Sequence, residues 1–383
     1  MPPRGRASGT GTQRLESLDS FRGFVILAMI FVNFCAGIEA IPAWMKHMPS
    51  KTDGYTFVDL VFPGFLFIVG VAIPLSLNKR LVIGDTALRL FLGRIVPRTA
   101  SLVFLGVVYV NMDRFSPEAT GVSEAAWKML FFLCVIILWM VTPAGLSEKR
   151  RRLLLVLRVL AAVCMAWLIF AFRQKTEDGS LAWFRPSWWG ILGMIGGSYL
   201  AASLAYLLTR GNPAALMGVL GFTIALFIGG RHGSLPGFLG PIDGVVSLGH
   251  LFGLKFVIFF GAGLYAAGQL IRPLHGIHKD WGTDAWALVS AGECCLMFAA
   301  FYYLIDARGW RRWASFLLPA GVNPLTAYIL PDIFGAVLDI THGWNIFWKS
   351  HEGSLGVLNC AVLTALMLVL TGLFTRFKLV LKL

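Results

Sequence analysis

The segment TFVDLVFPGFLFIVGVAIPLSL, Thr56–Leu77, decides the fold class of this chain. It places a single charged side chain, Asp59, in an apolar run of about 20 residues, the length that an α-helix needs to cross the hydrocarbon core of a bilayer. Inside a bilayer every backbone N–H and C=O group must be paired within the protein, so only helices and closed barrels can span it. Long apolar runs, rather than short alternating segments, indicate helices. We therefore predict an all-α, polytopic transmembrane helix bundle.

The composition of the whole chain favours the same class. Of the 383 residues, 57% are hydrophobic and 14% are charged, whereas a soluble domain has about 25% charged residues. A net charge of +13 could suggest nucleic acid as a partner. The basic residues, however, lie in short clusters between apolar runs, as membrane topology requires, and they form no aromatic and basic stripe of the kind that binds single strands. We expect membrane lipid, and no nucleic acid, as a partner.

The cysteines and the N-terminal residues carry less information. The first twenty residues are polar and contain no hydrophobic signal-peptide core, so we expect no cleavable signal peptide and a first span that acts as an uncleaved signal. The six cysteines lie within or beside apolar runs without CxxC spacing, which predicts packing residues and neither disulfides nor a metal site. They are Cys35, Cys134, Cys164, Cys294, Cys295 and Cys360.

Apolar runs define about 11 candidate spans (10–12), and no soluble domain fits between them. We expect residues 1–383 to form a single integral membrane domain with a cytoplasmic tail over residues 1–18. The candidate spans are 21–40, 57–78, 92–111, 125–142, 153–172, 187–209, 213–229, 250–271, 284–305, 314–335 and 354–375.

The distribution of lysine and arginine predicts the orientation of the chain. Basic residues gather in the N-terminal tail, after the second span and in EKRRR (Glu148–Arg152), so these segments should be cytoplasmic. The N-terminus is then cytoplasmic and the loop with His47 lies outside. Eleven spans would also place the basic segments 306–313 and 376–382 outside, against the rule. This conflict indicates that one run is not a full crossing or that a weak span is hidden, and the irregular region 236–284 is the place to look.

His47 and Asp59 are the ionisable pair of most chemical interest. A neutral imidazole can take a proton from an attacking amine or hydroxyl group near pH 7, and a carboxylate can hold the ring in one tautomer. Both residues fall at the external ends of their segments. The residues alone also allow a simpler interpretation, in which His47 is an interfacial loop residue and Asp59 caps a helix.

Several segments together resemble one family. RLESLDSFRGFVILAMIFVN (Arg14–Asn33), the dipeptide Lys46–His47 and the segment Thr56–Leu77 resemble the opening of the heparan-α-glucosaminide N-acetyltransferase family, which includes a bacterial branch of membrane acyltransferases. The segment Tyr303–Leu330 resembles the second conserved block of that family, and Arg185–Ala202 resembles a segment of the bacterial branch. These segments cover about a quarter of the chain.

The resemblance implies a transmembrane acyltransferase of the bacterial inner membrane. It would move acetyl from cytoplasmic acetyl-CoA to an amino or hydroxyl group of an extracytoplasmic sugar or envelope glycan. The catalytic histidine of the family falls on His47, and Asn33 and Asp59 match the asparagine and aspartate of its motifs, with Asn33 positioning the acyl group. Asn323 matches the asparagine of the second block and is a predicted cofactor-binding residue.

The phosphates of acetyl-CoA would need cationic partners on the cytoplasmic side. A basic cluster follows the second span, although membrane topology alone also explains such a cluster. The chain contains no nucleotide-binding P-loop or Rossmann glycine pattern. The predicted phosphate partners are Lys79, Arg80, Arg89, Arg94 and Arg98.

Three alternatives stay open at this point. One is a multi-pass transporter or flippase for a small anionic or glycan-linked solute, with Lys255, Glu293 and Asp332 along its route. The second is an inactive relative of the family. The third concerns the enzyme hypothesis itself, in which His47 is either a general base or an acyl carrier. A homo-oligomer is possible. Four other histidines are weak candidates for a functional site, and we interpret them as loop residues. They are His232, His250, His275 and His278.

Overall fold

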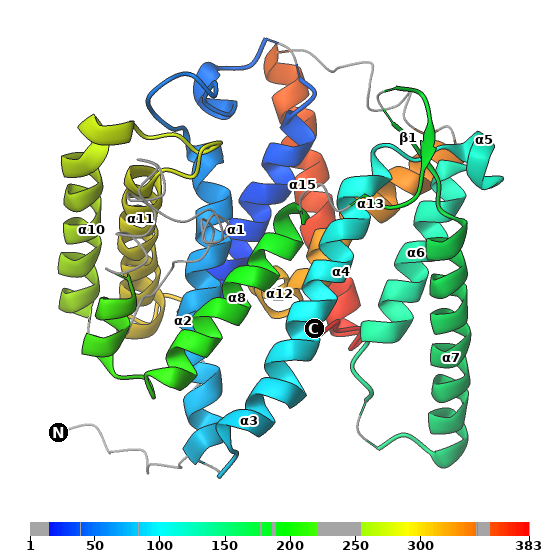
Figure 1. The fold of residues 1–383 in the computed structure, drawn as a ribbon, viewed down its shortest axis with the longest axis horizontal. Coiled ribbons are helices and arrows are strands. Elements are labelled where there is room, and N and C mark those ends of the chain that lie inside the picture. Colours follow the sequence, from blue (N-terminus) through cyan, green and yellow to red (C-terminus); the bar gives the residue numbers. More distant parts are fainter. Residues whose placement is uncertain are drawn as a thin grey trace.

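The computed structural model is a bundle of helices with one short β-hairpin, which confirms the predicted all-α class (Figure 1). It describes residues 15–38, 40–82, 84–143, 145–176, 178–185, 189–220, 254–341, 343 and 353–382. The α-helices are α1 Glu16–Cys35, α2 Val61–Val82, α3 Ala87–Leu90, α4 Val96–Met112, α5 Pro117–Thr120, α6 Glu124–Trp139, α7 Glu148–Ala171, α8 Gly190–Leu208, α10 Leu254–His275, α11 Asp284–Tyr302, α12 Leu318–Val322, α13 Pro324–Thr341 and α15 Gly353–Arg376. Short helical turns η1 Ala43–Met45, η2 Phe57–Leu60, η3 Phe91–Ile95, η5 Tyr303–Ala307 and η6 Arg312–Ala314 join them, and β1 Gln174–Lys175 pairs with β2 Leu181–Ala182.

Within the described residues, eight helices are long and apolar enough to cross a membrane. Ten of the eleven predicted spans overlap helices of the structure. Four spans, 21–40, 187–209, 213–229 and 250–271, also include residues outside the described ranges. The predicted span 314–335 is interrupted at Asn323, which separates α12 from α13. The last residues of the predicted cytoplasmic tail, 1–18, are helical, because α1 begins at Glu16.

The early start of α1 follows from close packing against α12. A Cβ atom added to Gly321 would lie 1.8 Å from the carbonyl oxygen of Asp19, so only glycine permits this approach. Ser17 and Asp19 are consequently buried. The polar start of α1 belongs to the bundle and is not part of an exposed tail.

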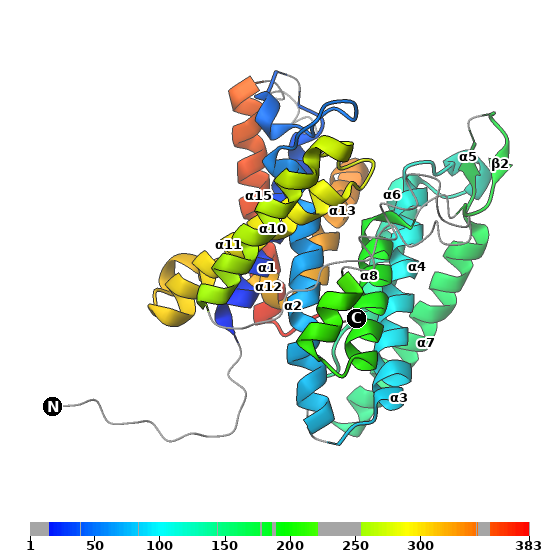
Figure 2. The same ribbon diagram turned by 60° about the vertical axis from the view of Figure 1, so that its left-hand side comes forward.

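Helix α1 occupies the centre of the bundle. Helices α10 and α11 lie on one side of it, and α4, α6 and α7 lie on the other (Figures 1 and 2). Phe21 is fully buried, and its ring contacts those of Phe67 from α2 and Phe298 from α11. Five of the six cysteines are buried in such helix contacts, as predicted for packing residues. The central position of α1 holds both of its ends fixed relative to the surrounding helices.

The connection after α11 lies at the end of the bundle where α1 begins. The backbone N–H of Ser17 donates to the Asp306 carboxylate at 3.3 Å, and Arg311 forms a 3.1 Å ion pair with Glu16. The basic segment 306–313 therefore lies at the end of the bundle where α1 begins. Of the two basic segments that eleven spans would place outside, 306–313 and 376–382, the first therefore no longer conflicts with the charge rule.

Asn323 brings the C-terminal residues to the same end. Its fully buried side chain donates to the carbonyl oxygen of Leu379 at 2.8 Å and to the Thr375 hydroxyl at 3.4 Å. Its carbonyl oxygen accepts from the Thr326 hydroxyl at 2.7 Å and from the Leu381 N–H at 3.1 Å. The amide has no free polar atom for a cofactor. We propose that Asn323 anchors the C-terminal segment, and its cofactor role stays a prediction.

We expect Asn323→Leu to lower the thermal unfolding temperature by several degrees. The substitution keeps the side-chain size but leaves a buried N–H and a buried C=O unpaired, and each such group costs about 1–3 kcal/mol. Thermal unfolding of the detergent-purified protein measures the effect. Thr341→Val is the control, because it removes a hydroxyl bonded to its own helix at an exposed position. Equal shifts in the two variants would contradict the anchoring role.

Candidate functional site

The loop between α1 and α2 is held against the end of the bundle opposite Glu16. Met45 in η1 is buried together with Cys35, at the end of α1, and Cys360 of α15, and Phe57 packs against the same cluster. The loop lies at the top of Figure 1, whereas α3 lies at the bottom. His47 follows Met45 by two residues, so its backbone is fixed by this apolar anchor.

Asp59 is a buried carboxylate at the start of η2. One of its oxygens, Oδ2, accepts the N–H of Thr56 at 2.9 Å and that of Met48 at 3.2 Å, and its side chain is 1% exposed. The Thr56 bond belongs to a capping box at the start of η2, in which Thr56 is the N-cap residue, and the Met48 bond ties the carboxylate to the preceding loop. They also fix the carboxylate in one orientation, which leaves its other oxygen, Oδ1, aimed at the loop.

His47 uses that second oxygen. Its Nδ1 lies 2.7 Å from Asp59 Oδ1, and the imidazole is 54% exposed. A carboxylate accepts hydrogen bonds only, so a neutral ring bonded to Asp59 carries its proton on Nδ1 and its lone pair on Nε2. The capping and catalytic interpretations of Asp59 are therefore compatible in one geometry.

Lys279, from the loop between α10 and α11, completes a cluster that the sequence did not predict. Its ammonium nitrogen lies 3.0 Å from His47 Nδ1 and 3.4 Å from Nε2, and 3.7 Å from Asp59 Oδ1. The only available signal was the polar run HKDW in an otherwise apolar region. No spacing rule connects that run to a histidine more than 200 residues earlier.

Asp53 ties the two loops together. Its carboxylate accepts the backbone N–H of Ile277 at 2.6 Å and the Arg272 guanidinium N–H at 2.9 Å. Ser50 donates a second hydrogen bond between the two loops, to Asp280. The Ile277 N–H first, and then Arg272, lower the pKa of Asp53 below its usual value. The position of Lys279 thus depends on a charged carboxylate of the loop that also carries His47.

Acid should weaken this link between the loops. A lowered folded-state pKa means that ionised Asp53 stabilises the folded loops above the ordinary Asp pKa of about 3.9, and that this contribution disappears as the pH falls through the lower folded value. We expect the difference in thermal stability between wild type and Asp53→Asn to be constant near neutral pH and to shrink below about pH 4. Thermal unfolding measured across pH tests this expectation, and a difference that persists unchanged at pH 3 would contradict it.

Tyr55 and Glu293 form a second polar contact beside the loop. The Tyr55 hydroxyl donates to Glu293 Oε1 at 2.5 Å. Burial, and then Glu293, raise the pKa of Tyr55. Asp332 instead accepts from Tyr109 at 3.0 Å, in another part of the bundle. The acidic residues of the predicted transport route are thus in separate contacts, and the side chain of Lys255 lies outside the described residues.

The other predicted site residues occupy both ends of the bundle. Asn33 is exposed in the last turn of α1, at the end that carries His47. Arg98, near the opposite end, lies over the Tyr199 ring at 4.6 Å, and its Nε atom is buried without a hydrogen-bond partner. Arg94 is exposed and Arg80 is half-buried. The described contacts do not join these arginines into one pocket, and the side chain of Lys79 lies outside the described residues.

The remaining histidines contribute no metal site in the described ranges. His275 lies 3.7 Å from Asp284, and His278 is buried against Trp281. A search of the described residues finds no group of three His, Cys, Asp or Glu side chains that could hold a metal ion. His232 and His250 lie outside the described residues.

These features define a class: a polytopic membrane protein with a half-exposed His–Asp pair, supported by a lysine, at one end of its bundle. The chain belongs to the family described as "Domain of unknown function (DUF5009)", whose model matches residues 14–240.

Two curated relatives confirm the resemblance seen in the sequence. The heparan-alpha-glucosaminide N-acetyltransferase of Mus musculus is 42% identical over 103 residues, which cover 27% of this chain and 15% of that protein. The Homo sapiens protein of the same name is 32% identical over 164 residues, 41% of this chain and 24% of that protein. The chain therefore spans at most about a quarter of the length of either relative in these matches.

Proposed function

We propose that this protein is a transmembrane acyltransferase that moves an acetyl group from cytoplasmic acetyl-CoA to an amino or hydroxyl group of an extracytoplasmic sugar or envelope glycan. The proposal rests on the 2.7 Å contact between half-exposed His47 and buried Asp59. The names of the two relatives support the reaction class.

His47 is the general base in this proposal. As the amino or hydroxyl group of the acceptor attacks the thioester carbonyl, Nε2 takes its proton. The C–S bond then breaks, and the imidazolium returns the proton to the departing thiolate of CoA. Asp59 stabilises the imidazolium and keeps the proton on Nδ1 in the resting ring. In the alternative route His47 Nε2 itself attacks the thioester and carries the acetyl group to the acceptor.

Lys279 and Asn33 support the transfer in different ways. The Lys279 ammonium beside Nε2 is placed to stabilise negative charge on the carbonyl oxygen of the tetrahedral intermediate. Asn33 lies exposed at the same end of the bundle, where its amide would position the acyl group. Both roles require that the thioester reach the outer end of the bundle.

The orientation follows from the basic residues. We place the end of the bundle at which α1 begins in the cytoplasm of a bacterial cell, with the protein in the inner membrane. Arg80, Arg94 and Arg98 would then face acetyl-CoA, and the unpartnered Nε of Arg98 suits a phosphate oxygen. The pantetheine arm would extend from there toward His47.

Binding of the donor tests the proposal. Purified protein should be stabilised against heat by acetyl-CoA and CoA, by about 2.7 kcal/mol at 100 times the dissociation constant. It should also transfer labelled acetyl from acetyl-CoA to glucosamine. If no acyl-CoA stabilised the protein and none supported transfer, the proposal would be overturned. Solute flux into proteoliposomes without acyl-CoA would favour the transporter instead.

A further inference from the structure

Two cysteines meet at the end of the bundle that carries the loop with His47. Cys35 is the last residue of α1, and Cys360 lies near the start of α15. A hydrogen bond joins the two thiols, and each residue is 2% exposed. Both belong to the apolar cluster with Met45 that anchors the loop. More than 300 positions separate them in the sequence, so no spacing pattern could have paired them.

The packing of α1 against α15 holds this thiol pair in place. The two helices run in opposite directions along each other (Figure 1). Ile30 of α1 and Met367 of α15 are buried in one shared cluster, and the two cysteines are buried in the next cluster toward the loop. Each helix is continuous between these two contacts. The two helix backbones therefore keep the thiols against each other.

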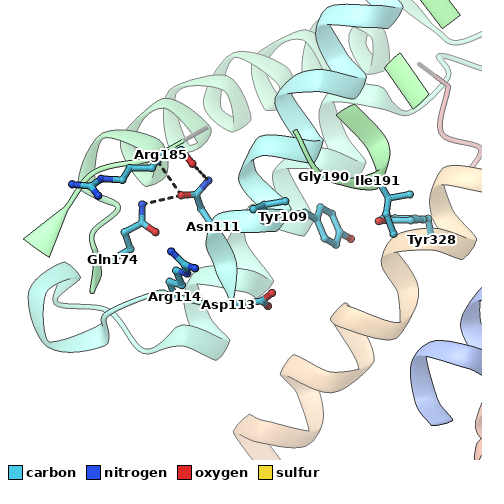
Figure 3. Close-up of a pocket in the computed structure, with 10 residues that line it drawn as sticks. Tyr109, Asn111, Asp113, Arg114, Gln174, Arg185, Gly190, Ile191 and Tyr328 are labelled. Atoms are coloured by element: carbon cyan, nitrogen blue, oxygen red, sulfur yellow. Dashed lines mark hydrogen bonds between the residues drawn. The ribbon is translucent and has the colours of Figure 1, made fainter. Parts of the chain in front are cut away.

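A second thiol pair lies deeper in the bundle and offers a comparison. A hydrogen bond also joins Cys134 of α6 and Cys164 of α7. Cys134 follows the start of α6 by ten residues, which is about 15 Å along the helix. The pair belongs to the hydrophobic cluster on which Tyr109 and Tyr328 pack, the aromatic wall of a cavity of about 390 Å³ (Figure 3). Cys35, in contrast, ends its helix next to the outer loop.

We propose that Cys35 and Cys360 form a disulfide bond when the chain reaches the periplasm, with a protein thiol oxidant of that compartment as electron acceptor. The inference rests on the orientation in the proposed function, which places the Cys35 end outside the cytoplasm. The bacterial periplasm is kept oxidising, whereas cytoplasmic thiols stay reduced. The oxidant acts before α15 packs against α1, because both cysteines are buried in the folded protein.

The bond forms by two thiol–disulfide exchanges. The thiolate of one cysteine attacks the disulfide of the oxidant, which gives a mixed disulfide and releases one thiolate of the oxidant. The thiolate of the other cysteine then attacks the mixed disulfide and forms the Cys35–Cys360 bond. The oxidant leaves as a dithiol that has taken up the two electrons and the two protons of the cysteines.

The bond would tie α1 to α15 directly beneath the loop with His47. It closes a loop of more than 300 residues, and a cross-link stabilises a protein mainly by constraining its unfolded chain, more so for longer loops. Because Met45 packs on the same cluster, the bond would also fix the end of α1 from which the loop starts.

Counting the thiols of protein taken directly from membranes tests the bond. Cells are quenched with acid, and the denatured full chain is labelled with a maleimide polymer before and after reduction. Four of the six cysteines should react before reduction, and all six should react after it. Protein made and purified with dithiothreitol present should unfold at a temperature several degrees lower. Six reactive thiols before reduction would overturn the inference.

Two double variants identify the cysteines in the bond. Cys35→Ala with Cys360→Ala should label the same four thiols before and after reduction, and its unfolding temperature should no longer respond to dithiothreitol. Cys134→Ala with Cys164→Ala is the matched control, because it removes the same number of thiols and should respond to dithiothreitol like wild type. A bond that disappears only in the control would overturn the inference. The count on wild type needs no variant, so it decides the matter even if a variant does not fold.

The orientation is measured separately. Lys51 is exposed on the loop with His47, and Lys51→Cys should react with a membrane-impermeant maleimide on spheroplasts more than wild type does. Such labelling together with six free thiols in wild type would overturn the disulfide and leave the orientation standing. Absence of labelling would overturn the orientation and, with it, the access to the oxidant. Stabilisation by acetyl-CoA is measured on the same wild-type protein, so a failed disulfide is distinguished from a failed acyltransferase.

Discussion

His47→Ala is expected to lower the rate of acetyl transfer about 10²- to 10⁴-fold, the usual contribution of a positioned general base. The imidazole is half exposed, so its removal leaves no cavity in the core and the variant should still fold. Buried Asp59 Oδ1 loses its 2.7 Å partner, however, so the thermal unfolding temperature should fall. Binding of acetyl-CoA should also persist, because its phosphates would lie at the other end of the bundle. Transfer of labelled acetyl to glucosamine and thermal shifts with acetyl-CoA measure the two effects on one preparation.

Lys51→Ala is the matched control for this variant. Lys51 is exposed on the same loop, four residues after His47, and should transfer acetyl at the wild-type rate. A His47→Ala protein with the full rate would exclude both the general base and the acyl carrier. Trapping of labelled acetyl on wild-type protein in the absence of acceptor, but not on the variant, would identify the carrier route.

The helical class could be predicted from the sequence because the bilayer restricts the possible folds so strongly. A run such as Thr56–Leu77 has no stable alternative to a helix in hydrocarbon. The boundaries were less accurate where packing overrides hydropathy. The start of α1 is polar, yet it is buried because Gly321 lets α12 approach the backbone of Asp19. A scan for apolar residues cannot detect this contact between distant segments.

The candidate site shows the same limit. His47 and Asp59 are twelve positions apart, and the residues alone could not show that Asp59 both caps η2 and contacts the imidazole. Lys279 was missed because the link through Asp53 to Arg272 is a long-range contact without a sequence pattern. Asn323 matched a family motif, but a motif does not distinguish a residue that binds a ligand from one that anchors the C-terminal segment.

Asp59→Asn is expected to reduce kcat by about 10²- to 10⁴-fold, with donor binding unchanged. The carboxylate accepts backbone N–H groups with one oxygen and His47 with the other, whereas an amide has one acceptor only. If the amide oxygen keeps the backbone bonds, its NH₂ group faces Nδ1. The ring then carries its proton on Nε2 and can no longer act as a base. In the serine-protease triad this same change of tautomer lowers kcat about 10⁴-fold.

The variant also separates two roles of Asp59. A purely structural cap would lower stability, and the kcat of the folded fraction would equal that of wild type. A residue that sets the tautomer lowers kcat in folded protein that still responds to acetyl-CoA in a thermal shift. Asp178→Asn, on the exposed hairpin turn, is the control for the chemical change and should leave kcat unaltered. One oxygen of Asp59 accepts the backbone N–H groups, and the other contacts His47. A loss of kcat that exceeds the loss of folded protein therefore indicates how far catalysis depends on the oxygen that faces His47.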